Sequence, residues 1–362
     1  MKNDIRIMKG NEALAEAALR AGMQAYFGYP ITPQSEVMEY LMLHGPNRGA
    51  IVLQAESELA AINMVYGASG AGARVLTSSS GPGISLMQEG ISYLASAELP
   101  CLIVNVQRGG PGLGTIQPSQ GDYFQAVKGG GHGDYRMIVL APASVQEMAD
   151  LVFDGFRLAE RYRLPVMILS DGALGQMMEK VQMPEEGSLP HETPAWATTG
   201  KTADRERNII TSLFIQPEKM EEVNIRLQKK YARIQRQETR CELIRVEDAD
   251  IVLVAFGLSA RIAQKALALA REKGLRVGLI RPITLFPFPS EAIAEQSLLV
   301  DAFLTVEMNA GQMVEDVKLA VDGKRPVLFK GRMGGMIPTP EEVLASIEAI
   351  AEEHVTTFAD RM

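Results

Sequence analysis

Residues 54–93 read QAESELAAINMVYGASGAGARVLTSSSGPGISLMQEGISY and set a helix pattern, a short strand and a glycine-rich turn in succession. The helix candidate (58–73) is rich in Ala and Gly, the strand candidate is Arg74-Val75-Leu76-Thr77, and the turn is Ser79-Ser80-Gly81-Pro82-Gly83. Similar apolar runs occur around this stretch, at 51–53, 101–106, 137–140 and 165–169. Because these runs are apolar throughout and separated by helical spacing, they predict parallel strands covered on both faces.

The same alternation restarts near residue 249, so we expect an α/β protein with two open parallel-sheet domains. The predicted boundaries are 1–182 for the first domain, 183–245 for a connector and 246–362 for a second, smaller domain. The connector ends in a charged helix with one apolar stripe, which predicts that this helix packs on the first domain. The stripe consists of Met220, Val223, Leu227, Tyr231 and Ile234.

Composition excludes several classes of protein. The 362 residues carry a net charge of −8 and no dense basic patch, which argues against binding to nucleic acid. Only Cys101 and Cys241 are present, too few for an iron–sulfur cluster or a structural zinc site, so we expect no metal on this chain. No apolar run approaches the roughly 18 residues of a membrane span, and no signal-peptide core is evident. We therefore expect no membrane partner and a cytoplasmic location.

The first candidate site follows an aromatic run, at Gly28-Tyr29-Pro30-Ile31-Thr32-Pro33. Loops at the carboxyl ends of parallel strands are where doubly wound sheets bind ligands. Two prolines restrict the backbone around Thr32 and hold its hydroxyl in one place. The alternative is a rigid helix start, with Thr32 as the cap and Pro33 as the first helical residue.

Glu56 and Glu58 open a helix whose remainder is almost entirely small or apolar. A carboxylate buried at a helix start is unusual, because burying an unpaired charge is costly. Residues two apart point to different faces, so one of the two glutamates is expected to point inward. The alternative is that both complement the helix dipole in the first turn. The small residues that follow, through Gly83, imply that something bulky approaches this backbone closely.

Arg108 follows another apolar strand and precedes Gly109-Gly110-Pro111-Gly112-Leu113-Gly114-Thr115. A guanidinium beside a glycine loop suits capture of a substrate carboxylate, while the alternative is a surface arginine. The loop lacks the Gly-Lys-Ser/Thr of a phosphate-binding P-loop. Downstream, the segment 120–136 (QGDYFQAVKGGGHGDYR) offers Gln120, Asp122 and His132 as further candidates, although a lone histidine in a polar loop is more often a hydrogen-bonding residue.

Taken together, these stretches resemble the α subunit of the 2-oxoacid:ferredoxin oxidoreductases. The resemblance rests on GNEALAEAALRAG, YFGYPITPQSE, the 54–93 stretch and NVQRGGPGLGT, and it runs nearly end to end. KGGGHGDYRMIVLAPASVQEM and DGALGQMMEK look closest to the branched-chain type, which acts on 3-methyl-2-oxobutanoate (2-ketoisovalerate). The resemblance implies a pyrimidine-side thiamine-diphosphate-binding first domain and a second domain like the C-terminal domain of transketolases.

Roles for individual residues follow from the resemblance. Thiamine enzymes place a glutamate on the aminopyrimidine ring nitrogen, nine positions before a glycine, and Glu58 with Gly67 matches this spacing whereas Glu56 does not. We expect Glu58 in that role, with Glu56 as the alternative. Thr32 matches the threonine near the 2-oxo group, and Arg108 matches the arginine that holds the substrate carboxylate. The remaining cofactor contacts expected from the resemblance are Tyr29, Pro30, Ile31, Gly81 and Pro82.

The sequence lacks the Gly-Asp-Gly and downstream Asn that anchor the diphosphate and Mg²⁺ in thiamine enzymes. The resemblance therefore implies a shared cofactor, with the diphosphate, Mg²⁺ and iron–sulfur sites on a β subunit. It further implies γ- and δ-type subunits, coenzyme A and ferredoxin. Two alternatives remain open: the same chemistry on 2-oxoglutarate, and a noncatalytic scaffold subunit.

Overall fold

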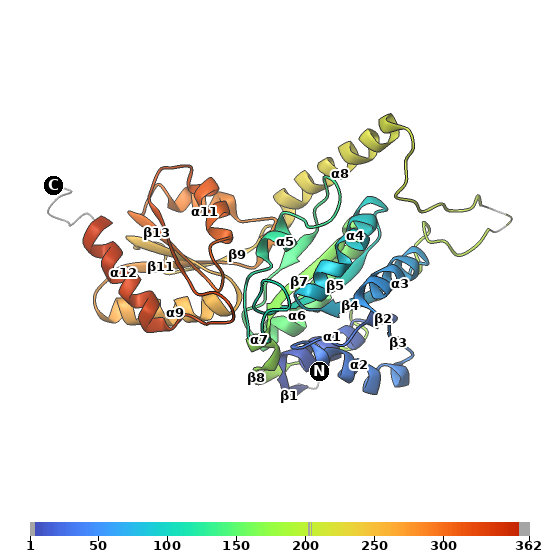
Figure 1. The fold of residues 1–362 in the computed structure, drawn as a ribbon, viewed down its shortest axis with the longest axis horizontal. Coiled ribbons are helices and arrows are strands. Elements are labelled where there is room, and N and C mark those ends of the chain that lie inside the picture. The colour runs from blue at the N-terminus through green and yellow to red at the C-terminus, as the bar shows by residue number, and fades with distance from the viewer. Residues whose placement is uncertain (1–3, 202, 204, 355–362) are drawn as a thin grey trace.

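The computed structural model describes residues 4–201, 203 and 205–354, so both ends of the predicted 1–362 domain arrangement lie outside the described residues. Two open sheets lie side by side with helices packed on their faces (Figure 1). The first sheet has seven strands. In spatial order these are β12 (Thr284–Phe286), β6 (Ile138–Leu140), β7 (Pro165–Asp171), β5 (Cys101–Gln107), β4 (Val75–Ser79), β2 (Ala25–Gly28) and β3 (Ile51–Gln54).

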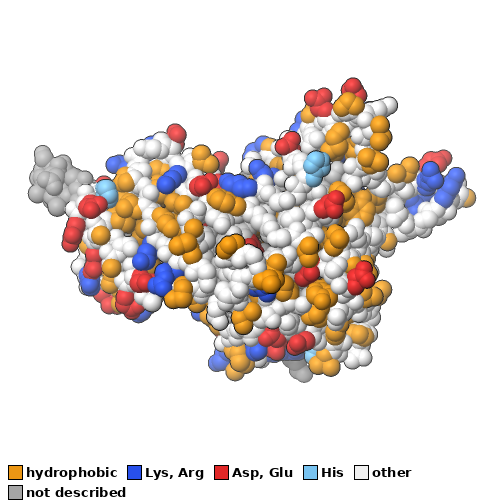
Figure 2. Space-filling view, in the orientation of Figure 1, with side chains coloured by type: hydrophobic (Ala, Val, Ile, Leu, Met, Phe, Trp, Pro, Cys, Tyr) orange, Lys and Arg blue, Asp and Glu red, His pale blue; other side chains and the backbone are white. Residues whose placement is uncertain are grey.

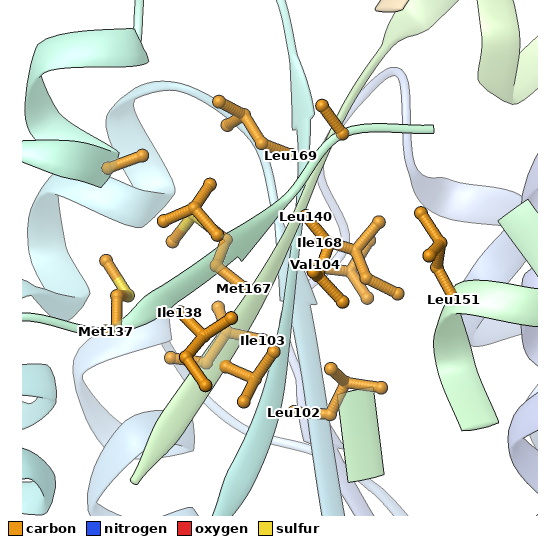
Figure 3. Close-up of a cluster of buried hydrophobic side chains, with 14 of the residues drawn as sticks. Leu102, Ile103, Val104, Met137, Ile138, Leu140, Leu151, Met167, Ile168 and Leu169 are labelled. Atoms are coloured by element: carbon orange, nitrogen blue, oxygen red, sulfur yellow. The ribbon is translucent and has the colours of Figure 1, made fainter. Parts of the chain in front are cut away.

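The central strands of the first sheet are fully buried from solvent. Every residue of β4, β5 and β7 is buried, and β5 pairs with both neighbours in parallel. Figure 3 shows side chains from β5, β6 and β7 meeting side chains of the surrounding elements in one apolar cluster. Uniformly apolar strands suit this position because a central parallel strand is covered by helices on both faces.

The two edges of the first sheet differ from the expectation. β12 comes from the second half of the chain and pairs antiparallel with β6. At the opposite edge, β3 leaves Ile51 62% exposed and Leu53 40% exposed, so the prediction of cover on both faces is wrong for this strand. An edge strand has only one neighbouring strand, and β3 packs against the core through Val52 while the face that carries Ile51 and Leu53 stays open.

Helices form a layer on each face of this sheet. α1 (Gly10–Arg20) packs against α6 (Val145–Tyr162) and α2 (Ser35–His44), whereas α3 (Glu58–Gly70) packs against α4 (Pro82–Ser96). The layers lie on opposite sides of the strands in Figure 1. The shorter elements are η1 (Pro46–Arg48), α5 (Tyr123–Val127), α7 (Gly172–Gln176) and an antiparallel pair, β1 (Ile5–Lys9) with β8 (Met178–Gln182).

The segment after β8 runs over the surface and projects from the body before it returns as the long helix α8 (Pro217–Glu238) (Figure 1). Figure 2 shows this projection on the right, with Lys and Arg side chains gathered on it. The α8 stripe is buried at Val223, Leu227, Tyr231 and Ile234, while Met220 is half-buried. Tyr231 meets Phe286 of β12 edge-on, with ring centroids 6.4 Å apart, so α8 packs over that edge of the first sheet.

The second sheet has five strands, parallel except for β9. Their order is β14 (Val327–Gly331), β13 (Ala302–Glu307), β10 (Ile251–Val254), β11 (Val277–Pro282) and β9 (Cys241–Ile244). One face carries α9 (Gly257–Glu272) and α12 (Pro340–His354), and the other carries α10 (Ser290–Gln296) and α11 (Met313–Val321).

Alternation along β10 divides the second core in two. Ile251 and Leu253 pack with α9 and α12, whereas Val252 and Val254 belong to the same apolar cluster as the core of the first sheet. One continuous hydrophobic core therefore joins the two sheets. Among the described residues, no helix is both long enough and apolar enough to cross a bilayer.

Candidate active site at the carboxyl edge of the first sheet

Four neighbouring strands of the first sheet end at one edge. β2 ends at Gly28, β3 at Gln54, β4 at Ser79 and β5 at Gln107. Because these strands are parallel, the loops that follow them meet at this edge. The loops carry most of the residues that the sequence singles out: the Tyr29–Thr32 loop, the start of α3, the start of α4 and Arg108.

Glu58 is the first residue of α3, and it is buried with 4% of its surface exposed. Ser57 caps the helix by accepting a hydrogen bond from the Ala60 amide at 3.2 Å. The Oε1 atom of Glu58 accepts a hydrogen bond from Ser79 Oγ at 3.1 Å. Glu56 is exposed, so of the two glutamates only Glu58 points inward. No Lys, Arg or His of the described residues forms an ion pair with Glu58.

The start of α4 closes on this carboxylate. A Cβ placed on Gly83 would lie 2.2 Å from Glu58 Oε1 and 2.1 Å from Ser79 Oγ, closer than any real contact. Gly81, the N-cap of α4, has a φ of +44°, a conformation that side chains disfavour. Small residues at these positions therefore allow the α4 backbone to lie directly against Glu58.

The Tyr29–Thr32 loop is largely exposed, and a hydrogen bond from the buried side chain of Gln34 holds it. Tyr29, Pro30 and Thr32 are exposed, and Ile31 is half-buried. Gln34 is fully buried, and its amide donates to the Tyr29 carbonyl at 3.2 Å and accepts from Ser78 Oγ at 2.6 Å. α2 begins at Ser35, so the alternative in which Pro33 is the first helical residue is wrong.

Arg108 reaches across this edge and joins two loops. Its Nη1 donates to the Thr32 carbonyl at 2.9 Å, and its Nη2 donates to the Leu113 carbonyl at 2.9 Å. A Cβ on Gly81 would lie 3.5 Å from Arg108 Cγ. The turn that contains Gly81 and Gly83 thus contacts Arg108 on one side and Glu58 on the other. The buried Nε of Arg108 has no hydrogen-bond partner in the structure.

Asp122, the residue before α5, lies next to this group, and its backbone amide donates to the side chain of Gln107, the last residue of β5, at 3.1 Å. Its Oδ2 accepts a hydrogen bond from Asn105 Nδ2 at 2.9 Å, and Asn105 pairs with Ser79 across the β4–β5 ladder. Burial raises the pKa of the Asp122 carboxyl, while the Asn105 amide and the Arg108 charge act in the opposite direction.

Among the described residues, neither Gln120 nor His132 makes a hydrogen bond with Glu58, Thr32 or Arg108. Gln120 is buried at the junction with the second domain, where its amide contacts Phe256, Ser259 and Met308. His132 is exposed and lines a separate cavity of about 240 Å³ beneath α8. The structure therefore does not bring these two candidates together with Glu58, Thr32 and Arg108.

Sequence reasoning missed three polar residues that support the site. Gln34, Ser78 and Asn105 are fully buried and hold the Tyr29–Thr32 loop or Asp122. Their one sequence signal was a polar residue within or beside an otherwise apolar or Pro-rich run. Among the described residues, no group of three or more His, Cys, Asp or Glu side chains is suited to hold a metal ion.

Comparison with known proteins shows which family the chain matches. Residues 16–244 match the family described as pyruvate flavodoxin/ferredoxin oxidoreductase, thiamine diphosphate-binding, and residues 249–343 match pyruvate:ferredoxin oxidoreductase core domain II. Ketoisovalerate oxidoreductase subunit VorB of Methanothermobacter thermautotrophicus is 52% identical over 96% of this chain and 98% of its own length. 2-Oxoglutarate synthase subunit KorA of Methanocaldococcus jannaschii is 37% identical over 94% of this chain and 98% of its own.

Solved structures agree on the fold. A 2-oxoglutarate:ferredoxin oxidoreductase from Magnetococcus marinus, solved with 2-oxoglutarate, coenzyme A and succinyl-CoA bound, superposes with a TM-score of 0.87 at 28% identity. The match covers 96% of this chain and 65% of that longer one. A split-gene transketolase, at 16% identity and a TM-score of 0.58 over 94% and 97% of the two chains, shares the fold alone. From the family match across both sheets and the identity to subunits of such enzymes, we conclude that the chain belongs to the 2-oxoacid:ferredoxin oxidoreductase family, as an α-type subunit of an oxidoreductase complex.

Proposed function

We propose that the chain is the α subunit of a complex that oxidatively decarboxylates 3-methyl-2-oxobutanoate to its acyl-CoA. In this reaction the 2-oxoacid loses carbon dioxide, the acyl group passes to the thiol of coenzyme A, and ferredoxin accepts the released electrons. Glu58 is the observation that carries the proposal. It is a buried carboxylate with one neutral donor, Ser79, and no cation beside it among the described residues.

Such a carboxylate fits thiamine diphosphate. Burial without a cation is costly for a carboxylate, and an added hydrogen-bond donor reduces that cost. The protonated ring nitrogen of an aminopyrimidine is such a donor, and Gly83 leaves the backbone room to pack against the same carboxylate. When bound, thiamine diphosphate supplies the electron sink for decarboxylation of a 2-oxoacid. Glu58 would hold the pyrimidine ring of thiamine diphosphate in position and would accept a hydrogen bond from the protonated ring nitrogen.

The remaining candidates have roles set by their positions. Arg108 would bind the substrate carboxylate, because its guanidinium has five N–H donors and the structure engages one each at Nη1 and Nη2. Thr32 would face the 2-oxo group from the exposed loop that Arg108 contacts. The pyrimidine would rest against Tyr29, Pro30, Ile31, Gly81 and Pro82.

The substrate assignment rests on the side chains around Arg108. A second carboxylate, as in 2-oxoglutarate, would need a further cation. Between Arg108 and Lys128 the sequence holds no Lys or Arg, and the Lys128 ammonium is paired with Asp316 of the second domain. Leu113 and Ile116, which are 80% and 57% exposed, offer an apolar surface in the same loop. These features suit a branched aliphatic side chain, and the 52% identity to a ketoisovalerate oxidoreductase subunit supports this choice.

The proposed complex completes the site with other chains. A β subunit would supply the diphosphate and Mg²⁺ site and an iron–sulfur cluster, and γ- and δ-type subunits would serve coenzyme A and ferredoxin. We infer a cytoplasmic location, where Cys101 and Cys241 would remain reduced.

The experiment is co-purification of this chain with its partner chains, followed by assays of 2-oxoacids with coenzyme A and a low-potential dye. We expect the complex to show a higher kcat/KM for 3-methyl-2-oxobutanoate than for 2-oxoglutarate. A preference for 2-oxoglutarate would overturn the substrate assignment. Full turnover by the Glu58→Gln complex would instead favour a scaffold role.

A further inference from the structure

The loop after Arg108 is a closed hairpin whose shape sets the position of the guanidinium. The Gly109 amide donates to the Gln117 carbonyl at 2.9 Å, and the Thr115 amide donates to the Gly109 carbonyl at 2.8 Å. The tip of this hairpin supplies the Leu113 carbonyl that accepts from Arg108 Nη2 at 2.9 Å. Any shift of the hairpin therefore moves one of the two acceptors that hold Arg108.

The second domain touches this hairpin through Gly334 and Gly335. A Cβ on Gly335 would lie 2.6 Å from Gln117 Cβ and 2.9 Å from Thr115 Cγ2. A Cβ on Gly109, from the other side, would lie 2.8 Å from the Gly335 nitrogen. The two backbones are thus in direct contact, at a separation that only glycine permits.

The turn that makes this contact has a firm base in its own domain. Glu342 of α12 accepts hydrogen bonds from Arg332 Nη1 at 2.5 Å and from the Thr339 amide at 3.0 Å, at the two ends of the turn. These hydrogen bonds, with the Arg332 bond charge-assisted, tie both ends of the turn to the same helix. The turn that contains Gly334 and Gly335 can therefore limit the movement of the hairpin against which it packs.

The second domain also holds the far end of the hairpin segment. Ser119 Oγ donates to the Met308 carbonyl at 3.1 Å, and the Gln120 amide nitrogen and carbonyl bond to Met308 and Asn309. The side chain of Gln120 donates to the Phe256 carbonyl at 2.8 Å and accepts from Ser259 Oγ at 2.7 Å. The segment from Gly109 to Gln120 is therefore bound by the second domain at both ends.

We propose that the second domain positions the Arg108 guanidinium for the substrate carboxylate, with Gly335 and Gln120 as positioning residues. This inference rests on the proposed role of Arg108. It assigns a function to the second domain, which contributes none of the residues predicted to contact the cofactor. The physical link is steric at Gly335 and hydrogen-bonded at Gln120.

The test compares Gly335→Ala, in the assembled complex, with alanine variants of two other glycines that also have a positive φ. Gly334 and Gly274 have φ values of +63° and +86°, against +92° for Gly335, and a Cβ on either meets nothing within 4 Å. Gly334→Ala and Gly274→Ala therefore carry the backbone strain without the collision. We expect Gly335→Ala to raise KM for the 2-oxoacid about tenfold or more, as a misplaced binding group does. KM for coenzyme A should match that of the control variants.

A compensating variant separates the steric link from general damage. Gln117→Gly removes the Cβ and Cγ atoms of Gln117, which include the nearest atom that the methyl group introduced by Gly335→Ala would meet, and leaves the contact with Thr115 Cγ2 in place. Combined with Gly335→Ala it should return KM for the 2-oxoacid toward the wild-type value. An unchanged KM in Gly335→Ala, or a loss in the double variant equal to that of the single one, would overturn the proposal.

A second readout does not depend on the substrate. Tryptic cleavage after Arg108, followed by mass spectrometry on the complex, should be several-fold faster in Gly335→Ala than in Gly334→Ala. Equal cleavage rates would count against the proposal whichever 2-oxoacid the complex uses. Faster cleavage in Gly335→Ala, together with a wild-type complex that turns over no 2-oxoacid, would support the steric link and reject the proposed function instead.

Discussion

Ser79, the last residue of β4, donates a hydrogen bond of 3.1 Å to the carboxylate of Glu58, the first residue of α3. The bond fixes a buried acidic group at the point where strand, helix and the start of α4 meet. Asn105, the neighbour of Ser79 on β5, extends this polar row to Asp122 and toward Arg108.

Replacing Glu58 with Gln should abolish most of the activity of the assembled complex. The amide keeps the shape and the Ser79 contact, but it removes the charge that would polarise the pyrimidine. We expect turnover to fall by about 10²- to 10⁴-fold, the range for losing a proton-transfer group. Steady-state assays with size-exclusion analysis would separate lost chemistry from lost assembly. Glu56→Gln is the control, because Glu56 is exposed, and a larger loss in that variant would contradict the assignment.

Gly83→Ala should damage the site without replacing any catalytic side chain. The added methyl would lie 2.2 Å from Glu58 Oε1, so the carboxylate or the start of α4 has to move. We expect the purified chain to lose about 1–3 kcal/mol of stability, as in other overpacked sites, and the complex to lose affinity for thiamine diphosphate. Scanning calorimetry and cofactor titration measure the two effects. In contrast, Gly67→Ala in α3 meets nothing within 4 Å and should raise the thermal midpoint.

Arg108→Lys should weaken substrate binding more than it slows turnover. A lysine ammonium cannot bond to the Thr32 and Leu113 carbonyls and a carboxylate in the same planar geometry. We expect KM for the 2-oxoacid to rise about 10- to 100-fold, which corresponds to about 1.5–3 kcal/mol for a charged hydrogen bond. Kinetics with a substrate series would measure this rise. A change confined to kcat would argue that Arg108 does not bind the carboxylate.

Asp171 should make folding depend on pH between about 4 and 6. Burial raises the pKa of its carboxyl from 3.8 to about 6, although the backbone amides of Leu174 and Ala173 act against this rise. Below a pH of about 3.8 the Asp171 carboxyl is protonated in both the folded and the unfolded chain. As pH rises through this window, the carboxyl ionises first in the unfolded chain. The free energy of unfolding therefore falls with rising pH, by about 3 kcal/mol at most.

Asp171→Asn removes this titration while an amide oxygen can still cap α7. The thermal midpoint of the variant, minus that of the wild type, should increase from pH 4 to pH 6 and stay constant above pH 7. Scanning fluorimetry over a pH series measures the difference. A difference that does not change with pH would show that Asp171 is not the group responsible.

The sequence predicted the sheets well where local pattern decides the structure. The runs at 101–106 and 165–169 lie within the fully buried strands β5 and β7, because a central parallel strand needs apolar side chains on both faces. The run at 51–53 is equally apolar, yet it forms an edge strand with Ile51 exposed. Pattern alone does not encode which strand lies at an edge, since that depends on the order of strands in space.

The same distinction applies to the site. The spacing from Glu58 to Gly67 that the family resemblance implies selected Glu58 over Glu56, and in the structure Glu58 is buried whereas Glu56 is exposed. The sequence placed Gln120 in the glycine-rich segment 120–136 as a candidate site residue, but its side-chain amide bonds to residues more than a hundred positions away. Contacts between distant segments leave no local signal in the sequence. For this reason the contacts of the second domain with the segment from Gly109 to Gln120 could not be predicted.

The strand Thr284–Phe286 belongs by sequence to the second half of the chain and by pairing to the first sheet. Cutting the gene near residue 245 would therefore strip β6 of its outer neighbour and expose a row of unsatisfied amides and carbonyls. An open border of that kind invites association with other chains. Anyone who wishes to exchange the two halves between relatives has to transplant these three residues together with the amino-terminal half.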